Sequence, residues 1–297
     1  MSRLLVFLLF LLPHHGLSRL IGKFAETARF KKALINTFIR LYKVDMSEAL
    51  LSDVDEFEHF NAFFTRELKP EARPLFKGEN TVVCPADGAI SQAGPIQTDS
   101  LLQAKGRYFK LADLLGGDAS LIELFSAGSF ATIYLSPRDY HRVHMPLGGQ
   151  LKKMIYVPGR LFPVNQRMAG SVYNLFARNE RVICLFQTKA GPMALVLIGA
   201  MIIAGIETVW SGQVCPRAGA RKLQVKSYET CYPPIELPAG AEMGRFKSGS
   251  TTIVLFGPGT IKLEAALTAG TQVRMGQLLG TLRENGVLNS SNDRKWR

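Results

Sequence analysis

From about Thr81 onward, the chain consists of short apolar runs separated by glycine and proline, and this pattern limits the folds that it can adopt. The runs are Val82–Cys84, Ala89–Ile90, Phe130–Leu135, Met154–Val157, Val182–Phe186, Met193–Ile206, Thr251–Phe256 and Lys262–Leu267. Runs of this length between turn-forming residues are typical of β-strands. Even the longest one falls short of the roughly 20 residues that span a bilayer, so it predicts one or two buried strands. We therefore expect an α+β fold with N-terminal helices and a β-rich core.

Two glycine-containing segments indicate how these strands connect. Pro85-Ala86-Asp87-Gly88 predicts a tight turn between two strands. Residues 270–280 place glycines where a hammerhead-like β-sandwich turns, as in biotinyl and lipoyl domains. We therefore expect the core to have a barrel-sandwich character, followed by a polar, frayed tail over residues 286–297.

The composition narrows the class of protein. With 297 residues, 47% apolar and 20% charged, the chain can build a substantial core in one large domain or two small ones. Its formal net charge of +12 predicts a polyanionic partner. Because no nucleic-acid-binding signature is visible, an anionic lipid surface is favoured over nucleic acid. The four cysteines form no C-x-x-C pair, so we expect reduced core residues rather than a disulfide framework or a zinc site.

The first 45 residues have the pattern of a membrane-associating helical segment. Leu4–Leu12 is an uninterrupted apolar run that is too short to span a bilayer, although it could form the core of a signal peptide. Apolar residues recur at helical spacing within Leu17–Leu41, accompanied by lysines and arginines from Arg19 to Lys43. This pattern predicts amphipathic helices in the membrane interface, with a helix packed on the protein's own core as the alternative. A buried aromatic face is expected next, from Phe57, Phe60, Phe63 and Phe64.

Two of the five histidines lie in one motif, residues 136–146. The motif begins with serine and proline, which suit a helix N-cap and the first helical position, and Asp139 would favour the exposed N–H groups. It predicts a single helical turn with His141 and His144 on one side. Three uses remain open for the pair. They could bind zinc, although no third ligand at a familiar spacing is found; they could be structural; or they could carry out acid–base chemistry.

A glycine–serine pair, Gly249–Ser250, stands directly before a β-prone run. The hydroxyl of such a serine can attack the preceding carbonyl, so that the amide becomes an ester. The ester can then eliminate, and the new N-terminus can hydrolyse to a pyruvoyl group. A plain turn has the same sequence, so the pair alone indicates little. Asp87 is equally open, as a turn former or as the residue that orients His144 while this histidine takes the proton of a serine.

Several blocks of the sequence, in order, resemble the bacterial phosphatidylserine decarboxylases, a family of pyruvoyl-dependent membrane enzymes. The resemblance runs from about Leu41 to Leu282. Its blocks are Tyr42-Lys43-Val44-Asp45-Met46, Phe60-Asn61-Ala62-Phe63-Phe64, Pro85-Ala86-Asp87-Gly88, Tyr134–Pro146, Asn174–Val182, Glu207-Thr208-Val209-Trp210 and Met243-Gly244-Arg245-Phe246. The family's self-cleavage motif is usually Leu-Gly-Ser-Thr, and here Ser248 replaces the leucine.

The resemblance implies where the chain is cut. Gly249–Ser250 would be the scissile bond within a catalytic domain that covers residues 46–285. Cleavage would give a β chain of residues 1–249 and an α chain of residues 250–297, which begins with a pyruvoyl group derived from Ser250.

The resemblance also implies the roles of the site residues. Asp87, His144 and Ser250 match the family's self-processing triad, in which His144 removes the serine proton and Asp87 orients the histidine. His141 is the candidate proton donor in the later reaction. That reaction converts phosphatidylserine to phosphatidylethanolamine and CO2 through a Schiff base with the pyruvoyl group, and no metal is expected.

The implied partners are phosphatidylserine, an anionic membrane surface and the two chains of one precursor, with a homodimer left open and no nucleic acid. The expected location is the cytoplasmic side of the cell membrane, as a peripheral protein. Two other readings of the same residues stay open. A serine hydrolase would use Asp87, His144 and an intact Ser250 on an external ester or peptide, and a non-enzymatic membrane adaptor would remain one uncleaved chain.

Overall fold

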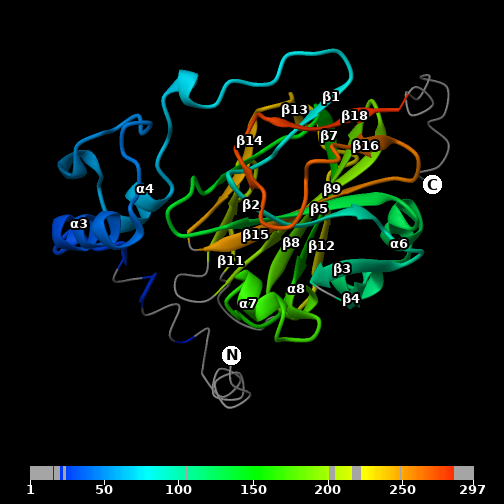
Figure 1. Cartoon of the computed structure of the whole chain (residues 1–297), viewed down its shortest axis with the longest axis horizontal. Coiled ribbons are helices and arrows are strands. Elements are labelled where there is room, and N and C mark those ends of the chain that lie inside the picture. The colour runs from blue at the N-terminus through cyan, green and yellow to red at the C-terminus, as the bar shows by residue number, and fades with distance from the viewer. Residues whose placement is uncertain are drawn as a thin grey trace.

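The structure is a computed structural model that describes residues 16, 21–22, 25–104, 106–200, 205–215, 222–247 and 249–283. A β-rich core carries a few short helices, and the helices of the N-terminal region lie together at one side of the core (Figure 1). The fold is therefore α+β with strands dominating, as the glycine- and proline-separated runs predict.

The core is organised by a nine-stranded antiparallel sheet in which β15 (Ser250–Phe256) lies between β5 (Ser129–Leu135) and β9 (Gly191–Ile198). The other strands are β12 (Gln224–Ser227), β7 (Gly149–Val157) and β8 (Arg181–Thr188) beyond β9, then β2 (Gly88–Pro95) and β17 (Gln272–Val273) beyond β5, with β13 (Glu236–Leu237) paired to β7. Two hydrogen-bonded ladders therefore fix the backbone of β15.

Smaller sheets and short helices cover the two faces of this sheet. The small sheets are β1 (Thr81–Val83), β18 (Leu278–Leu282) and β16 (Ile261–Leu263); β11 (Gly212–Cys215), β10 (Ile206–Thr208), β14 (Glu242–Phe246) and β6 (Arg142–His144); and β3 (Ser100–Ala104) with β4 (Arg107–Lys110). The helices are α3 (Lys31–Tyr42), α4 (Phe60–Phe64), α5 (Leu111–Leu114), α6 (Ala119–Phe125), α7 (Gln166–Ala169) and α8 (Leu175–Arg178), with 3₁₀ turns η1 (Val54–Glu56) and η2 (Pro70–Ala72).

Side chains along β15 alternate between two hydrophobic cores. Val254 and Phe256 join the core shared with β1, β18, β6, β10 and β14. Ile253 and Leu255 join the core under β3, β4 and the helices α5–α8. Every residue of β15 is buried, which explains why the strand reads as a continuous β-branched and apolar run rather than as an alternating one.

The expected aromatic face is confirmed, and it forms a third hydrophobic cluster. Phe57, Phe60, Phe63 and Phe64 are all buried there. Phe38 of α3 meets the rings of α4 edge-on, at 5.1 Å from Phe60. In the described part of the N-terminal region, the helix thus packs on the protein's own cluster, which is the alternative that the sequence left open. Leu4–Leu12 and most of residues 17–24 lie outside the described residues.

No helix within the described ranges is both long and apolar enough to cross a bilayer. The four cysteines are free, and only Cys231 is exposed.

The run Met193–Ile206 is divided between two strands, one of the two outcomes that the sequence predicted, because β9 ends at Ile198 and β10 begins at Ile206, in another sheet. One strand boundary differs from the sequence prediction. The run Lys262–Leu267 leaves the sheet after Leu263. Among the described residues the sheets stay open and form no closed barrel. The turn at Pro85–Gly88 is present, and it joins β1 to β2 as expected.

Candidate active site

Ser250 is the first residue of β15 and is fully buried. It lies opposite Leu135 of β5, and the next residue, Thr251, lies opposite Ile198 of β9. The strand forms here because threonine, isoleucine and valine follow the serine, and these residue types favour strands. Only residues 247–249 separate Ser250 from β14, so the predicted scissile bond lies where the chain crosses from a small sheet to the large one.

The hydroxyl groups at the start of β15 have no hydrogen-bond partner within the described part of the chain. The three are the hydroxyls of Ser250, Thr251 and Thr252, and each is buried. Buried polar groups are usually paired, so a cluster of unpaired ones requires an explanation. A serine hydroxyl that no partner holds is free to turn toward the carbonyl of Gly249.

An apolar cavity of about 460 Å³ opens beside Gly249. Its wall combines side chains of α3 and α4 with residues of the core, and it includes Phe38, Leu41, Phe64, Tyr134, Val164, Ala200 and Gly249. Among the described residues that line it, Lys247 alone carries a charge. A larger groove of about 730 Å³ lies between β2 and β16, but none of the predicted site residues lines it. The apolar cavity is therefore the one that fits the chemistry expected at Gly249–Ser250.

The histidine motif does not form the expected helical turn. Asp139 donates its N–H to the Ser136 carbonyl, and its carboxylate accepts from the N–H and the hydroxyl of Ser136, each at 2.7 Å. The chain then becomes extended as β6, which pairs with β14. Residues three apart in extended chain point to opposite sides, so the prediction that His141 and His144 share one side is wrong. Pairing with β14 outweighs the local capping pattern.

His141 is buried and presents a lone pair to the interior. Its Nδ1 lies 2.8 Å from the Asp139 carbonyl, which can only accept, so we assign the ring proton to Nδ1. Its Nε2 is buried without a partner among the described residues. Burial, together with the nearby cation of Arg66, lowers the pKa of His141 to about 3. The centroid of the ring lies 4.1 Å from that of Phe64, with the two planes tilted by 42°, and Phe64 also lines the apolar cavity.

His144 is held by both ring nitrogens. Nδ1 lies 2.9 Å from the Gly240 carbonyl and therefore donates to it, so Nε2 accepts from the Tyr140 hydroxyl at 3.0 Å. Its backbone N–H donates to Pro85 in the turn that carries Asp87. Burial lowers the pKa of His144, and burial likewise raises the pKa of Tyr140. His144 is thus a neutral imidazole whose basic nitrogen already has a partner.

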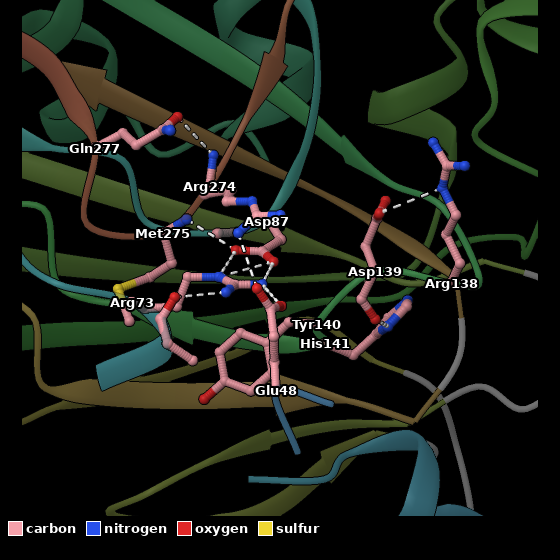
Figure 2. A network of polar contacts seen from close by, with 12 residues as sticks. Glu48, Arg73, Asp87, Arg138, Asp139, Tyr140, His141, Arg274, Met275 and Gln277 are labelled. Carbon is pink, nitrogen blue, oxygen red and sulfur yellow. Dashed lines mark hydrogen bonds and ion pairs between the residues drawn. The ribbon is translucent and has the colours of Figure 1, made fainter. Parts of the chain in front are cut away.

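Asp87 is fixed by an arginine and a backbone N–H (Figure 2). Its carboxylate accepts from Nε and Nη2 of Arg73 and from the N–H of Met275, which lies 2.9 Å from Oδ1. Arg73 also binds Glu48, which in turn binds Arg274. Among the described residues, no hydrogen bond joins Asp87 to His144 or His144 to Ser250. The structure keeps Ser250 as serine, so this is the arrangement before any cleavage.

The structure brings the predicted residues toward one end of the large sheet by backbone contacts. The Asp87 turn contacts β6 through Pro85 and His144, and Gly88 approaches the carbonyl of Tyr134, the residue before the one that lies opposite Ser250. The sequence did not indicate Tyr140 or Arg73. Tyr140 could have been suggested by its place four residues before His144, whereas Arg73 has no local signal.

The fold and the site define a class of protein in which a buried serine begins a central strand beside an apolar cavity. The family model described as phosphatidylserine decarboxylase matches residues 60–281. A further model, described as PSD, matches residues 4–43. The chain therefore belongs to the phosphatidylserine decarboxylase family.

Similar curated proteins cover almost the whole chain. A phosphatidylserine decarboxylase proenzyme of Pseudomonas putida (strain GB-1) is 58% identical over 94% of this chain and 97% of its own length. The proenzyme of Pseudomonas aeruginosa (strain PAO1) is 58% identical over 96% of this chain and 99% of its own length. That of Ectopseudomonas mendocina (strain ymp) is also 58% identical, over 94% and 98%.

Proposed function

We propose that the chain decarboxylates phosphatidylserine to phosphatidylethanolamine and CO2, with a pyruvoyl group made by self-cleavage at Gly249–Ser250. The observation that carries this proposal is the placement of the scissile pair. Ser250 is buried, its hydroxyl has no hydrogen-bond partner among the residues that the structure describes, and Gly249 lies in the wall of an apolar cavity. The names of the similar proenzymes agree with a precursor that is processed.

Self-cleavage begins with the Ser250 hydroxyl. His144 takes its proton, Oγ bonds to the Gly249 carbonyl carbon, and the C–N bond breaks to leave an ester. Elimination removes the Cα proton of residue 250, releases the Gly249 carboxylate and leaves a carbon–carbon double bond. This enamine becomes an imine, and water adds to the imine carbon, so that a ketone forms and ammonia leaves. In the precursor His144 must first exchange the Tyr140 hydroxyl for that of Ser250. Asp87 supports His144 from the neighbouring turn.

A pyruvoyl group supplies a ketone that condenses with the substrate amine and withdraws electrons as CO2 leaves. The residues around position 250 fit such a group, because it replaces a serine whose hydroxyl makes no hydrogen bond in the described structure and so breaks no network. The apolar cavity accepts acyl chains and keeps water away from the reacting carboxylate. His141 donates the proton that replaces CO2. Because its low pKa makes His141 neutral in the precursor, Nε2 must first take up a proton, and the ammonium group of the entering substrate is the source of that proton.

The membrane is the partner that presents the substrate. Residues 1–45 associate with an anionic leaflet on the cytoplasmic side as a peripheral segment. The net charge of +12 and the exposed side chains of Phe30 and Leu41 on or beside α3 support this proposal. We expect binding to phosphatidylserine vesicles to weaken partly when salt is raised, because salt screens only the charge contribution. Vesicle binding that does not change with salt would contradict the proposed attraction between the basic protein and the anionic lipids.

The chain could also form a homodimer, a proposal that a measurement of its mass in solution tests.

A finer proposal concerns the core. The pairing of β16 with β18 and the turn at Gly276, with φ of +86°, support a sandwich of the biotinyl and lipoyl kind near the C-terminus.

The activity is tested with vesicles that contain phosphatidylserine labelled at the serine carboxyl. We expect labelled CO2 from the purified protein, and we expect a carbonyl reagent such as phenylhydrazine to abolish it. A fluorophosphonate probe should label none of the cleaved protein. Release of fatty acid or of free serine instead of CO2, together with labelling of Ser250, would identify a serine hydrolase and contradict the proposal.

A further inference from the structure

The carboxylate of Asp87 lies at the end of an ion network that joins residues from before and after the predicted cleavage site in the sequence (Figure 2). Arg73 and Glu48 come from the part of the chain before Gly249, whereas Arg274 and Met275 come from the part after it. Two carboxylates and two guanidinium groups alternate, from Arg274 through Glu48 and Arg73 to Asp87. The network has no net charge, and it connects the future β and α chains without passing through the scissile bond.

The contacts become more buried toward Asp87. The side chains of Arg73 and Asp87 are only 8% and 9% exposed, whereas Glu48 is 25% exposed and Arg274 is 58% exposed. Arg73 meets Asp87 with Nε and Nη2 together, a fork-like contact that fixes the plane of the carboxylate. Glu48 accepts a hydrogen bond from the same Nη2 at 2.8 Å, and Nη1 of Arg73 donates to the carbonyl of Ala72. The orientation of Asp87 is therefore set mainly by Arg73, and Arg274 acts only through Glu48.

The turn that carries Asp87 touches β6, which carries His144, and β5, which pairs with the strand that begins at Ser250. Pro85 accepts the backbone N–H of His144 in β6. Gly88 has φ of +151°, and a Cβ built there would lie 2.2 Å from the carbonyl oxygen of Tyr134 in β5. Because the next residue of β5 lies opposite Ser250, a small movement of this turn would shift Asp87 and His144 relative to the serine.

We propose that Arg73 is a positioning residue for self-cleavage, which holds Asp87 and its turn in the geometry that brings His144 to Ser250. This inference rests on the proposed function, because it assumes that Asp87, His144 and Ser250 carry out the cleavage. Arg73 itself touches neither the scissile bond nor the apolar cavity. Once cleavage is complete, its remaining role is to keep Asp87 bound to the N–H of Met275, between the two chains.

The test measures the rate at which newly made precursor is cut. Precursors are produced by cell-free translation, synthesis is stopped, and the fraction cleaved is followed on denaturing gels. We expect Arg73→Gln to slow cleavage about 10- to 100-fold. A loss of this size is common when a residue that orients a functional side chain by hydrogen bonding is removed. Arg73→Lys should recover only part of the rate, because an ammonium cannot form the two-pronged contact. Arg274→Gln is the matched control and should stay within about twofold of wild type, since it leaves the Arg73–Asp87 contact in place.

A second measurement separates positioning from simple loss of folding. Arg73→Ala precursor is incubated with millimolar guanidinium chloride or with sodium chloride at the same ionic strength. We expect guanidinium alone to accelerate cleavage, because it can occupy the vacated site beside Asp87. Thermal unfolding of the Arg73→Ala, Arg73→Gln and Arg274→Gln precursors is compared in a Ser250→Ala background, which keeps every chain intact. Equal acceleration by both salts, or cleavage by Arg73→Gln at the wild-type rate, would overturn the inference.

Asp87→Asn, measured in parallel, distinguishes the two proposals. If Asp87→Asn is blocked while Arg73→Gln cleaves normally, only the role of Arg73 fails. If Asp87→Asn itself cleaves at the wild-type rate, the proposed role of Asp87 fails first, and that of Arg73 fails with it. If both are slow and guanidinium rescues Arg73→Ala, both roles are supported.

Discussion

The two sides of the candidate site differ in how their polar groups are paired. On the side of Asp87, both carboxylate oxygens accept hydrogen bonds from Arg73 and one also accepts from Met275. On the side of Ser250, the serine hydroxyl and Nε2 of His141 are buried without partners among the described residues. An unpaired buried polar group costs about 1–3 kcal/mol. The hydrogen bonds around Asp87 therefore hold its carboxylate in one orientation. Ser250 and His141, by contrast, are free to form new hydrogen bonds during the reaction.

His144 contacts the Asp87 turn and is the proposed base for Ser250. Its backbone is bound to the Asp87 turn through Pro85, but its basic nitrogen is occupied by the Tyr140 hydroxyl rather than by Ser250. The Asp87 turn thus positions the backbone of His144, while the Tyr140 hydroxyl donates a hydrogen bond to Nε2 of His144 in the precursor. The comparison predicts that substitutions of Ser250 or His141 change the rates of cleavage or decarboxylation most. A substitution of Tyr140 should change the cleavage rate less.

The largest expected effect comes from Ser250→Ala. Without the hydroxyl no ester can form, so the chain should remain a single full-length polypeptide with no decarboxylase activity. Denaturing gels and a CO2 assay measure both results. The matched control is Thr252→Ala, which removes another buried hydroxyl of the same strand that has no partner in the described ranges, and this variant should still be cleaved. Cleavage of Ser250→Ala at the wild-type position would show that the nucleophile is another residue.

The two histidines should separate cleavage from decarboxylation. We expect His144→Ala to slow cleavage about 10²- to 10⁴-fold, the usual contribution of a general base. His141→Ala should still be cleaved but should decarboxylate poorly per cleaved chain, because its proton donor is lost. The fraction cleaved and the rate of CO2 release per pyruvoyl group are measured on the same samples. Equal cleavage of both variants would mean that the base is assigned to the wrong histidine.

The sequence predicted those parts of the fold and site that depend on local pattern. The strands, the turn at Pro85–Gly88 and the aromatic face of α4 are present, because short apolar runs and turn residues act locally. The helical turn around His141 was wrong, because β6 pairs with β14 from a distant part of the chain. Arg73 could not be found either, because no local pattern connects it to Asp87, from which it is separated by a loop and β1.

The free energy of unfolding should depend on pH through His141, an effect smaller than those of the Ser250 and His144 substitutions. The pKa of His141 is about 3 in the folded protein and 6.5 for an ordinary histidine, so between these values only the unfolded chain binds the proton. The free energy of unfolding should therefore fall as the pH drops from about 6.5 toward 3, by up to about 1.4 kcal/mol per pH unit for this group. Urea unfolding of Ser250→Ala precursor at several pH values measures this slope.

The control for this prediction is His141→Gln in the same background. It should show a shallower slope than the parent, because one buried imidazole is removed while the carboxylates and His144 still titrate. Identical slopes would contradict the assignment of His141 as a buried neutral group.

The smallest effect is expected from Tyr140→Phe. This change removes the hydroxyl that donates to Nε2 of His144 and leaves the ring in place. A neutral hydrogen bond contributes about 0.5–1.5 kcal/mol, so its loss should make the lone pair available and speed cleavage by about 2- to 10-fold. Slower cleavage would instead indicate that Tyr140 carries a proton between His144 and the serine. The time course of precursor cleavage decides between the two results.

The most direct measurement is the mass of the purified, active protein under denaturing conditions. Two species should be found, one ending at Gly249 and one that begins at residue 250 with a ketone in place of the amine, and their masses should sum to nearly that of the 32.8 kDa chain. Active material that contains only the intact 32.8 kDa species would contradict self-cleavage at Ser250 and the pyruvoyl chemistry that depends on it.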